Sequence, residues 1–437
     1  MKSYIKILGL FAAGVGMMCM TSCDETDAKK DEGKTPSVQY VRYCDPAEAS
    51  EHIDGAYLGE TVALIGSGMG DVQEIWFNDQ KATLNPTMVT SHSIIVTIPS
   101  GISNNVTDMM TLVTSRGHKA EVPFHVLVPV PQVNSMSNEW ANPGDEVTLS
   151  GLYMVNDEDA PLKVVFPGGA TVDGKDIVSD GHMGATFTVP EGVQEGQIQV
   201  ISRYGTGYSN FIYRDTRGMI LDWDGKNGKA VALANGWRDG SKVVTDSFEG
   251  IPALDGKYAC FNSVKNDRDA MDEDNASFNH WSVWDGEGHT PSLDPSSLFD
   301  ASNWTGYTLK FEAFVPDYNP WTMCSLQIIW TSAELNNQND YVFSDDYPRA
   351  LWSPWEKTGS YTTGGKWVTV SVPLANANVN RYGDATSISL DKDSFKGLTF
   401  IVAWGPDTGL TEQTVILAVD NIRVAPLQEE MPEASVE

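Results

Sequence analysis

Hydrophobic and polar residues alternate along most of the chain in short runs that glycine, asparagine, aspartate and proline interrupt. The runs SIIVTIPSG and KWVTVSVPL are clear examples, with apolar side chains at every second position. Such alternation predicts β-strands that bury one face. Long segments with the apolar spacing of an amphipathic helix are almost absent. The pattern therefore predicts an all-β protein.

One pattern occurs twice between residues 39 and 214. Each copy opens with G-[DE]-x-V-x-L-x-G, at residues 59–66 and 144–151. A V/I-x-F strand, a strand ending in Val/Ile-Pro and a final pair of strands follow in both copies. The alternation buries one strand face, and the last glycine of the motif is expected to end the strand. We therefore expect two β-sandwich domains, at 39–128 and 129–214, joined by a proline-stiffened linker.

Residues 215–427 carry a different set of strands, which fits a larger β-sandwich or jelly roll. Its main strands lie in the runs NWTGYTLKFEAFVP, SLQIIW, KWVTVSVPL, GLTFIVAW and TVILAVDNIRVAP. Residues 428–437 are polar and are expected to form a disordered tail.

The N-terminus reads as a secretory signal over residues 1–22, because two lysines precede a short apolar run. Its end, Met20-Thr21-Ser22-Cys23, resembles a bacterial lipobox, in which Cys23 would be acylated. An ordinary signal peptide with an incidental cysteine is the alternative. Residues 23–38 are polar and are expected to form a flexible acidic tether. No later segment has the length and apolarity to span a bilayer, so we expect membrane attachment only through the lipid.

Charge and cysteine content narrow the possible partners. The formal net charge of −30 at pH 7 argues against nucleic acid and anionic lipid, which bind basic surfaces. Three cysteines remain after Cys19 and Cys23, namely Cys44, Cys260 and Cys324. These three cysteines allow one disulfide, but there is no CxxC pattern of the kind that binds zinc.

Thirteen tryptophans are present, and all but Trp76 and Trp140 lie in the second half of the chain. Several have polar, turn-rich neighbours, which suits sugars, since sugars stack apolar C–H faces on rings and hydrogen-bond through hydroxyls. About half of the rings are expected to pack in the core, among them Trp223, Trp304 and Trp367. The parity of Trp330 with Ile328 leaves a core position open for that ring too. The candidate glycan contacts are Trp281, Trp284, Trp321, Trp330, Trp352, Trp355, Trp404 and the polar Gln327.

The two repeats resemble IPT/TIG immunoglobulin-like domains, and the last region resembles carbohydrate-binding jelly rolls. With the lipobox and the acidic residues after it, this order resembles the Bacteroidetes surface glycan-binding lipoproteins of polysaccharide utilisation loci, in the SusE/SusF position and similar to SGBP-B. The resemblance implies a non-catalytic lipoprotein exposed on the outer membrane. It would capture a plant-type glycan, with xyloglucan or another β-glucan as best candidate, beside a SusC/SusD-like transporter and surface hydrolases. No cofactor is expected. A structural calcium site at Asp222, Asp224 and Asp420 is an alternative that the sequence leaves open.

Two other functions stay open. A surface glycoside hydrolase or lyase with accessory immunoglobulin-like domains would need two carboxylates at a set separation, and no catalytic motif marks such a pair. A protein-binding surface adhesin would also use aromatic residues.

Overall fold

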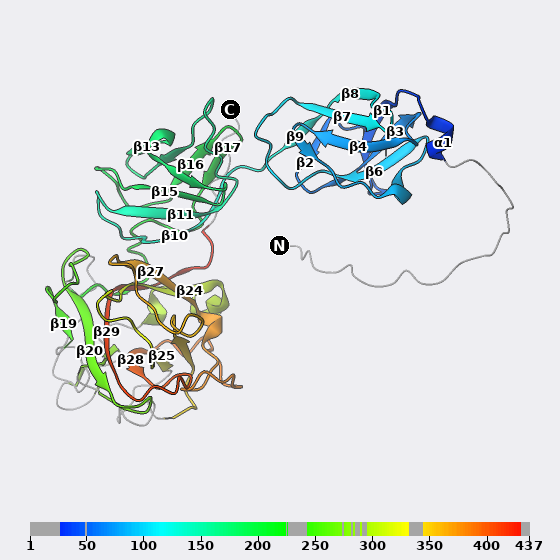
Figure 1. Ribbon diagram of the computed structural model, residues 1–437. Helices are drawn as coiled ribbons and strands as arrows, with labels where there is room; N and C mark the ends of the chain where they lie inside the picture. The colour runs from blue at the N-terminus through cyan, green and yellow to red at the C-terminus, as the bar shows by residue number, and fades with distance from the viewer. Residues whose placement is uncertain are drawn as a thin grey trace. The chain divides into compact units, whose positions relative to one another are not determined.

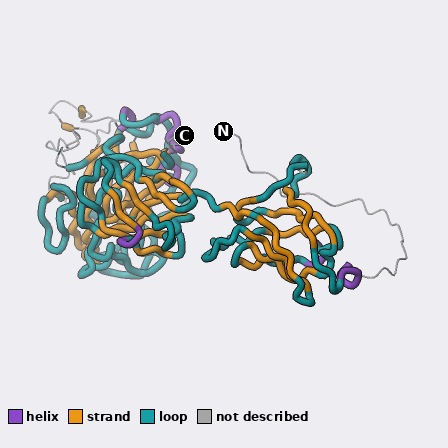
Figure 2. The backbone as a smooth tube through the Cα atoms, turned by 90° about the horizontal axis from the view of Figure 1, so that it is seen from above, coloured by secondary structure: helices purple, strands orange, loops and turns teal. Residues whose placement is uncertain are grey.

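The computed structural model describes residues 27–48, 50–223, 225, 243–272, 275–280, 283–284, 289–290, 295–331 and 344–429. These residues are almost entirely strands and loops (Figures 1 and 2), so the expectation of an all-β protein is confirmed. None of the described helices is long and apolar enough to cross a bilayer. The helical segments are α1 (Asp27–Asp31), η1 (Pro86–Met88), η2 (Gly174–Asp176), η3 (Pro295–Ser297), η4 (Ala301–Gly306) and η5 (Leu374–Asn376).

The chain divides into two compact units between Pro129 and Val130. The first unit is a sandwich of the sheets β1-β3-β6 and β5-β4-β7-β8, with a parallel pair β2-β9. Apolar side chains from both larger sheets form its core, among them Leu64, Phe77 and Leu112. The strands are β1 (Ser37–Tyr43), β2 (Gly55–Tyr57), β3 (Thr61–Ser67), β4 (Val72–Phe77), β5 (Gln80–Lys81), β6 (Ser93–Thr97), β7 (Met109–Thr114), β8 (Lys119–Pro123) and β9 (His125–Leu127).

The segment before β1 packs on this sandwich. Asp31 is 2% exposed, and its carboxylate accepts a hydrogen bond from the Gly70 amide at 2.9 Å. Asp27 accepts one from the Ser91 amide at 3.2 Å. The expectation of a flexible tether is therefore wrong for residues 27–38, because the acidic side chains find backbone donors on nearby loops. Residues 1–26, including Cys23, lie outside the described part.

The second sandwich repeats the first and pairs the sheets β10-β11-β15-β14 and β13-β12-β16-β17. In both copies the first strand pairs with the motif strand, and the register shifts once, at Val38/Tyr40 and at Val133/Ser135. The strands are β10 (Gln132–Met136), β11 (Glu146–Leu152), β12 (Lys163–Val165), β13 (Thr171–Asp173), β14 (Val178–Asp180), β15 (Gly184–Thr188), β16 (Gln199–Ser202) and β17 (Gly205–Tyr208).

The last glycine of each motif does not end its strand, as the sequence had suggested. Gly66 lies within β3 and Gly151 within β11. A Cβ atom there would lie 1.9 Å from the Ser37 carbonyl oxygen or 1.8 Å from that of Gln132. The motif therefore needs glycine where a bulged neighbouring strand approaches closely.

The C-terminal domain is a larger sandwich. One sheet runs β19-β20-β29-β24-β27 with β18 also on β29, and the other runs β21-β28-β25-β26. Its main core lies between them and includes Phe311, Leu326 and Phe400. The strands are β18 (Met219–Leu221), β19 (Val244–Thr245), β20 (Tyr258–Lys265), β21 (Ser277–His280), β22 (Val283–Trp284), β23 (His289–Thr290), β24 (Tyr307–Phe314), β25 (Ser325–Thr331), β26 (Arg349–Trp352), β27 (Val368–Pro373), β28 (Gly397–Ala403) and β29 (Gln413–Pro426).

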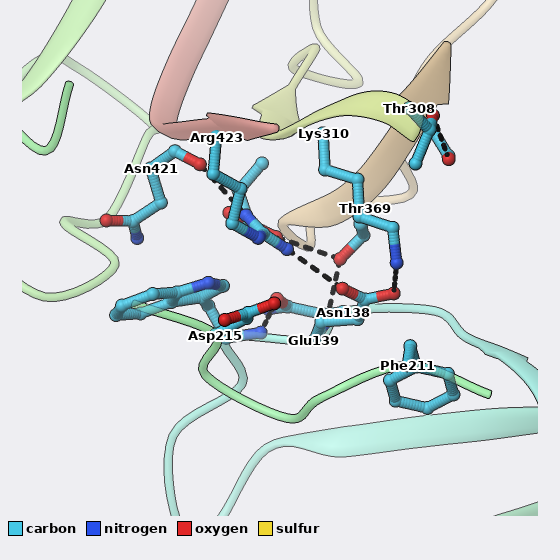
Figure 3. A network of polar contacts seen from close by, with 12 residues as sticks. Asn138, Glu139, Phe211, Asp215, Thr308, Lys310, Thr369, Asn421 and Arg423 are labelled. Atoms are coloured by element: carbon cyan, nitrogen blue, oxygen red, sulfur yellow. Dashed lines mark hydrogen bonds and ion pairs between the residues drawn. The ribbon is translucent and has the colours of Figure 1, made fainter. Parts of the chain in front are cut away.

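The second sandwich and the C-terminal domain form one compact unit, although the sequence suggested a boundary after residue 214. Trp140 of the sandwich packs in an apolar cluster with C-terminal residues such as Tyr258 and Trp367. Beside it, Glu139 binds Lys310 Nζ at 2.6 Å and Arg423 Nη2 at 2.9 Å, as Figure 3 shows. Buried ions and apolar packing together hold the two parts in one unit.

The cysteines and the C-terminal end complete the fold. Cys44, Cys260 and Cys324 are free thiols. Burial raises the pKa of the Cys260 thiol to about 12 and that of Cys324 to about 11. Glu429 pairs with Arg217, so the expected disorder is wrong at this residue. Residues 430–437 lie outside the described part.

Candidate functional site

A groove in the C-terminal domain lies beside the edge strand β26 and has a volume of about 800 Å³. We call it the β26 groove. The walls come from β26 with the loop after it, β27, residues 376–379 at the end of η5 and after it, the turn at 380–384 and the loop after β28. Arg268 adds a side chain from the loop after β20. The lining residues are Arg268, Ala350, Leu351, Trp352, Ser353, Pro354, Glu356, Val372, Asn376, Asn378, Val379, Tyr382, Gly383, Asp384, Pro406 and Asp407.

Trp352 forms the aromatic wall of the groove at the end of β26. It lies opposite Leu326 in the ladder, so its ring leans toward the core. There it meets Phe311 at 5.6 Å and Trp321 at 5.4 Å between ring centroids, both edge-to-face. Because β26 is an edge strand, the ring stays half-exposed and lines the groove. Packing on one side thus fixes the orientation of a ring that is open on the other.

Tyr382 forms a second aromatic wall. The Arg268 guanidinium lies 4.6 Å from the centre of its ring, and the Tyr382 hydroxyl donates to Asp269 at 3.0 Å. Burial and the Asp269 carboxylate raise the pKa of the Tyr382 phenol, so it remains a neutral donor. Asn380 Oδ1 accepts from the amides of Tyr382 at 2.9 Å and Asp384 at 3.0 Å, which holds the turn tightly.

Gln327 supports this turn from below, and the prediction that it contacts a ligand is wrong. The side chain is fully buried, since it points to the covered face of β25. Its amide nitrogen donates to the carbonyls of Arg381 at 3.1 Å and Ala403 at 2.9 Å. Its oxygen accepts from Arg349 at 3.3 Å. Gln327 therefore positions the turn that carries Tyr382.

Four of the predicted tryptophan contacts are buried, which contradicts a stacking role for them in this structure. Trp321 is 0% exposed, Trp330 1%, Trp355 3% and Trp404 3%. The first three belong to the main core. The indole N–H groups of Trp321 and Trp355 donate to the backbone carbonyls of Met323 and Cys324. The Arg381 guanidinium lies 5.5 Å from the Trp404 ring centre. A ring without exposed faces cannot stack on a sugar.

The other tryptophans of the C-terminal domain pack in its core wherever the structure describes their side chains. Trp223 and Trp367 are buried, and Trp304 is partly buried against the core. The prediction that these three rings pack in the core is therefore confirmed. Trp281 and the side chain of Trp284 lie outside the described part, as does Asp224. Within that part, no three acidic, histidine or cysteine side chains converge as a metal site. Asp420 is buried beside Asp255, and burial raises its pKa well above the usual value.

The groove combines flat apolar surfaces with exposed polar groups. Trp352, Tyr382 and Pro354 supply the former, and the exposed amides of Asn376 and Asn378 supply donors and acceptors. This pairing suits a sugar ring, which has apolar faces and a hydroxyl edge. The groove therefore has the chemistry of a carbohydrate site.

Tyr382 is the aromatic side chain of the groove that the sequence interpretation missed. It lies in NRYGD, a polar turn segment of the kind used to select tryptophans. The same criterion applied to tyrosine would have included it. Arg268 carried no comparable signal, because only the fold brings the loop after β20 to the turn at 380–384.

The chain is similar to several known proteins. A family model, the surface glycan-binding protein B xyloglucan binding domain, matches residues 213–426. The crystal structure of surface glycan-binding protein PbSGBP-B from Prevotella bryantii is similar, with a TM-score of 0.77, 30% identity, and coverage of 91% of this chain and 100% of that one. An IPT/TIG domain-containing protein from Bacteroides ovatus is 28% identical over 222 residues, which is 47% of this chain and 44% of that protein. The chain thus spans less than half the length of this curated relative. The similarity over the whole Prevotella chain shows that the protein belongs to the surface glycan-binding protein B family.

Proposed function

We propose that the β26 groove binds a neutral plant-type β-glucan, with xyloglucan as the first ligand to test. The observation that carries the proposal is that Trp352 and Tyr382 line one groove in the domain whose family model is described as xyloglucan-binding. A β-glucan chain presents extended apolar faces to such rings and hydroxyls to the asparagines of the same groove.

The expected affinity follows from the number of rings. Each stacking contact is worth about 1–2 kcal/mol by analogy with other ring stacking. Two rings and several hydrogen bonds, less the cost of ordering the ligand, give a dissociation constant in the range of roughly micromolar to millimolar.

Isothermal titration of the full-length protein with xyloglucan, mixed-linkage glucan and mannan tests the proposal. Trp352→Ala and Tyr382→Ala should each weaken binding to the preferred glycan by about 5–30-fold. Tyr318→Ala is the matched control, because Tyr318 is 58% exposed on the same domain and does not line the groove. Unchanged affinity in both groove variants would place the glycan elsewhere, and no binding to any glycan would refute the proposal.

We also propose that the protein is not an enzyme. The support is membership of a family of binding proteins. The groove does contain carboxylates, so the assay must be direct: incubation with the bound glycan should release no reducing ends. Measurable release, lost on replacing Glu356 or Asp384, would favour the hydrolase alternative.

A lipid anchor at Cys23 and a place on the outer surface of the outer membrane complete the proposal. The support is the segment Met20-Thr21-Ser22-Cys23 and the acidic residues after it. Cys23→Ala should abolish lipid labelling and shift the protein away from the membrane fraction. Protease treatment of whole cells should remove the wild type. Co-purification from such membranes tests the proposed SusC/SusD-like transporter and hydrolase partners.

A further inference from the structure

We infer that the β26 groove discriminates against glycans that carry carboxylate groups, and that Glu356, Asp384 and Asp407 cause this discrimination. The inference rests on the proposed function and names the side chains that exclude charged glycans from the groove. None of these three side chains can take part in ring stacking.

Three separate segments bring these carboxylates to one groove. Glu356 follows the Trp352–Trp355 loop, Asp384 ends the turn that carries Tyr382, and Asp407 lies in the loop after β28. All three are exposed, and none forms an ion pair with a described residue.

Other acidic groups near the groove have partners of their own. Asp345 pairs with Arg381 at 3.2 Å, and Asp269 accepts the Tyr382 hydroxyl at 3.0 Å. Arg268 is the cation among the lining residues, and its guanidinium lies over the Tyr382 ring. Three acidic side chains against one arginine give the lining a formal charge of −2.

All three carboxylates line one groove of about 800 Å³, so a ligand that fills it meets each of them. Like charges within the Debye length of about 8 Å at physiological salt are poorly screened, so a bound uronate would be repelled and would lose hydration. Sugar hydroxyls, by contrast, can donate hydrogen bonds to the same carboxylates, which a ligand carboxylate cannot do. Such like-charge juxtaposition rejects a wrong partner more than it strengthens the right one.

Two forms of one glycan isolate the effect of charge. Xyloglucan with C6-carboxylate groups and the methyl ester of the same preparation carry the modification at the same positions, but only the first is charged. For the full-length protein, the dissociation constant of the carboxylate form should exceed that of the ester at least about tenfold at low salt. The ratio should fall toward one at about 500 mM NaCl, where screening is strong.

Two charge-matched variants decide which residues are responsible. In the triple variant Glu356→Gln/Asp384→Asn/Asp407→Asn the ratio should fall to about twofold or less. The triple variant Glu158→Gln/Asp176→Asn/Glu191→Gln changes three exposed carboxylates of the second sandwich and should keep the wild-type ratio. Because the ratio compares two ligands on one protein, any general loss of affinity cancels.

The outcomes separate this inference from the proposed function. If wild type binds both forms equally at low salt, or if the groove triple variant keeps the full ratio, the discrimination is absent or has another origin and the inference is overturned. If neither the ester nor unmodified xyloglucan binds, the proposed function fails and the inference falls with it.

Discussion

Replacing Arg423 with methionine tests how the second sandwich and the C-terminal domain are held together. Arg423 is 0% exposed and binds Glu312 at 2.8 and 3.1 Å through its two terminal nitrogens. It also binds Glu139 of the second sandwich at 2.9 Å (Figure 3). Methionine keeps most of the alkyl volume and removes the charge, so the variant isolates the ionic contribution.

The expected cost is large because the remaining carboxylates stay buried. Lys310 still binds Glu139 at 2.6 Å, but Glu312 loses its cationic partner. Removing one member of a buried pair typically costs about 3–5 kcal/mol. That is a large share of the roughly 5–15 kcal/mol that stabilises a domain. The stability of the whole second unit should therefore fall by about that amount.

Peptide-resolved hydrogen exchange in increasing urea measures this loss. Peptides from β11 and from β29 should lose protection at a lower urea concentration in Arg423→Met, and together. Peptides from β3 belong to the first unit and should not change. The control is Arg203→Met, whose partner Asp157 and own side chain are 19% and 33% exposed, so the change should stay within about 1 kcal/mol.

A second variant shows whether the cost comes from the unpaired carboxylate. Arg423→Met/Glu312→Leu removes both charges and should recover at least about 2 kcal/mol of the loss. A loss below about 1 kcal/mol in Arg423→Met, or no recovery in the double variant, would refute this account of the buried network.

Burial raises the pKa of Glu312 from 4.5 to about 7, so the folded state binds its proton more tightly. The contribution of Glu312 to the stability of the second unit should therefore be full below about pH 4.5 and should be lost, by about 3 kcal/mol, as the pH rises to 7. Urea titrations of Glu312→Gln should lack this part of the pH dependence. Gln327→Leu removes the hydrogen bond to the Arg381 carbonyl in the turn at 380–384, so hydrogen exchange there should increase and glycan affinity should fall severalfold. An unchanged affinity would show that the turn does not need this support. Gly66→Ala should destabilise the first unit by about 1–3 kcal/mol because its Cβ meets the Ser37 carbonyl, whereas Gly101→Ala faces only the end of the Gln80 side chain and should have a much smaller effect on the urea midpoint.

Sequence patterns identified tryptophans with polar neighbours, but they did not show which of these rings are exposed and which are buried. Trp321 and Trp355 have polar, turn-like neighbours in sequence, yet both rings are buried and bind backbone carbonyls. A loop that folds back over the edge of a sandwich buries its large side chains whatever their sequence neighbours are. Trp352 has similar neighbours but ends an edge strand, and this position leaves it half-exposed.

The position of Trp330 in its strand could have shown that its ring packs in the core rather than contacts a ligand. It shares the buried side of β25 with Leu326 and Ile328, and all three lie in the main core. The parity of Gln327 puts it on the other side of the strand, which the sequence alone would place in solvent. Other parts of the chain cover that side in the fold, and Gln327 became a support for a turn.

The sequence by itself determined the all-β class, the repeat of the first two sandwiches and the aromatic and polar composition that suits the last domain to carbohydrate binding. These properties depend on periodicity, turn residues and composition, which are local or additive along the chain. The tertiary structure decided which rings are open, which segments build the β26 groove, and that the second and third domains form one unit. Those properties depend on contacts between residues such as Glu139 and Arg423, or Arg268 and Tyr382, that are far apart in the sequence. No local pattern encodes such contacts, because they arise only when the sheets close on one another.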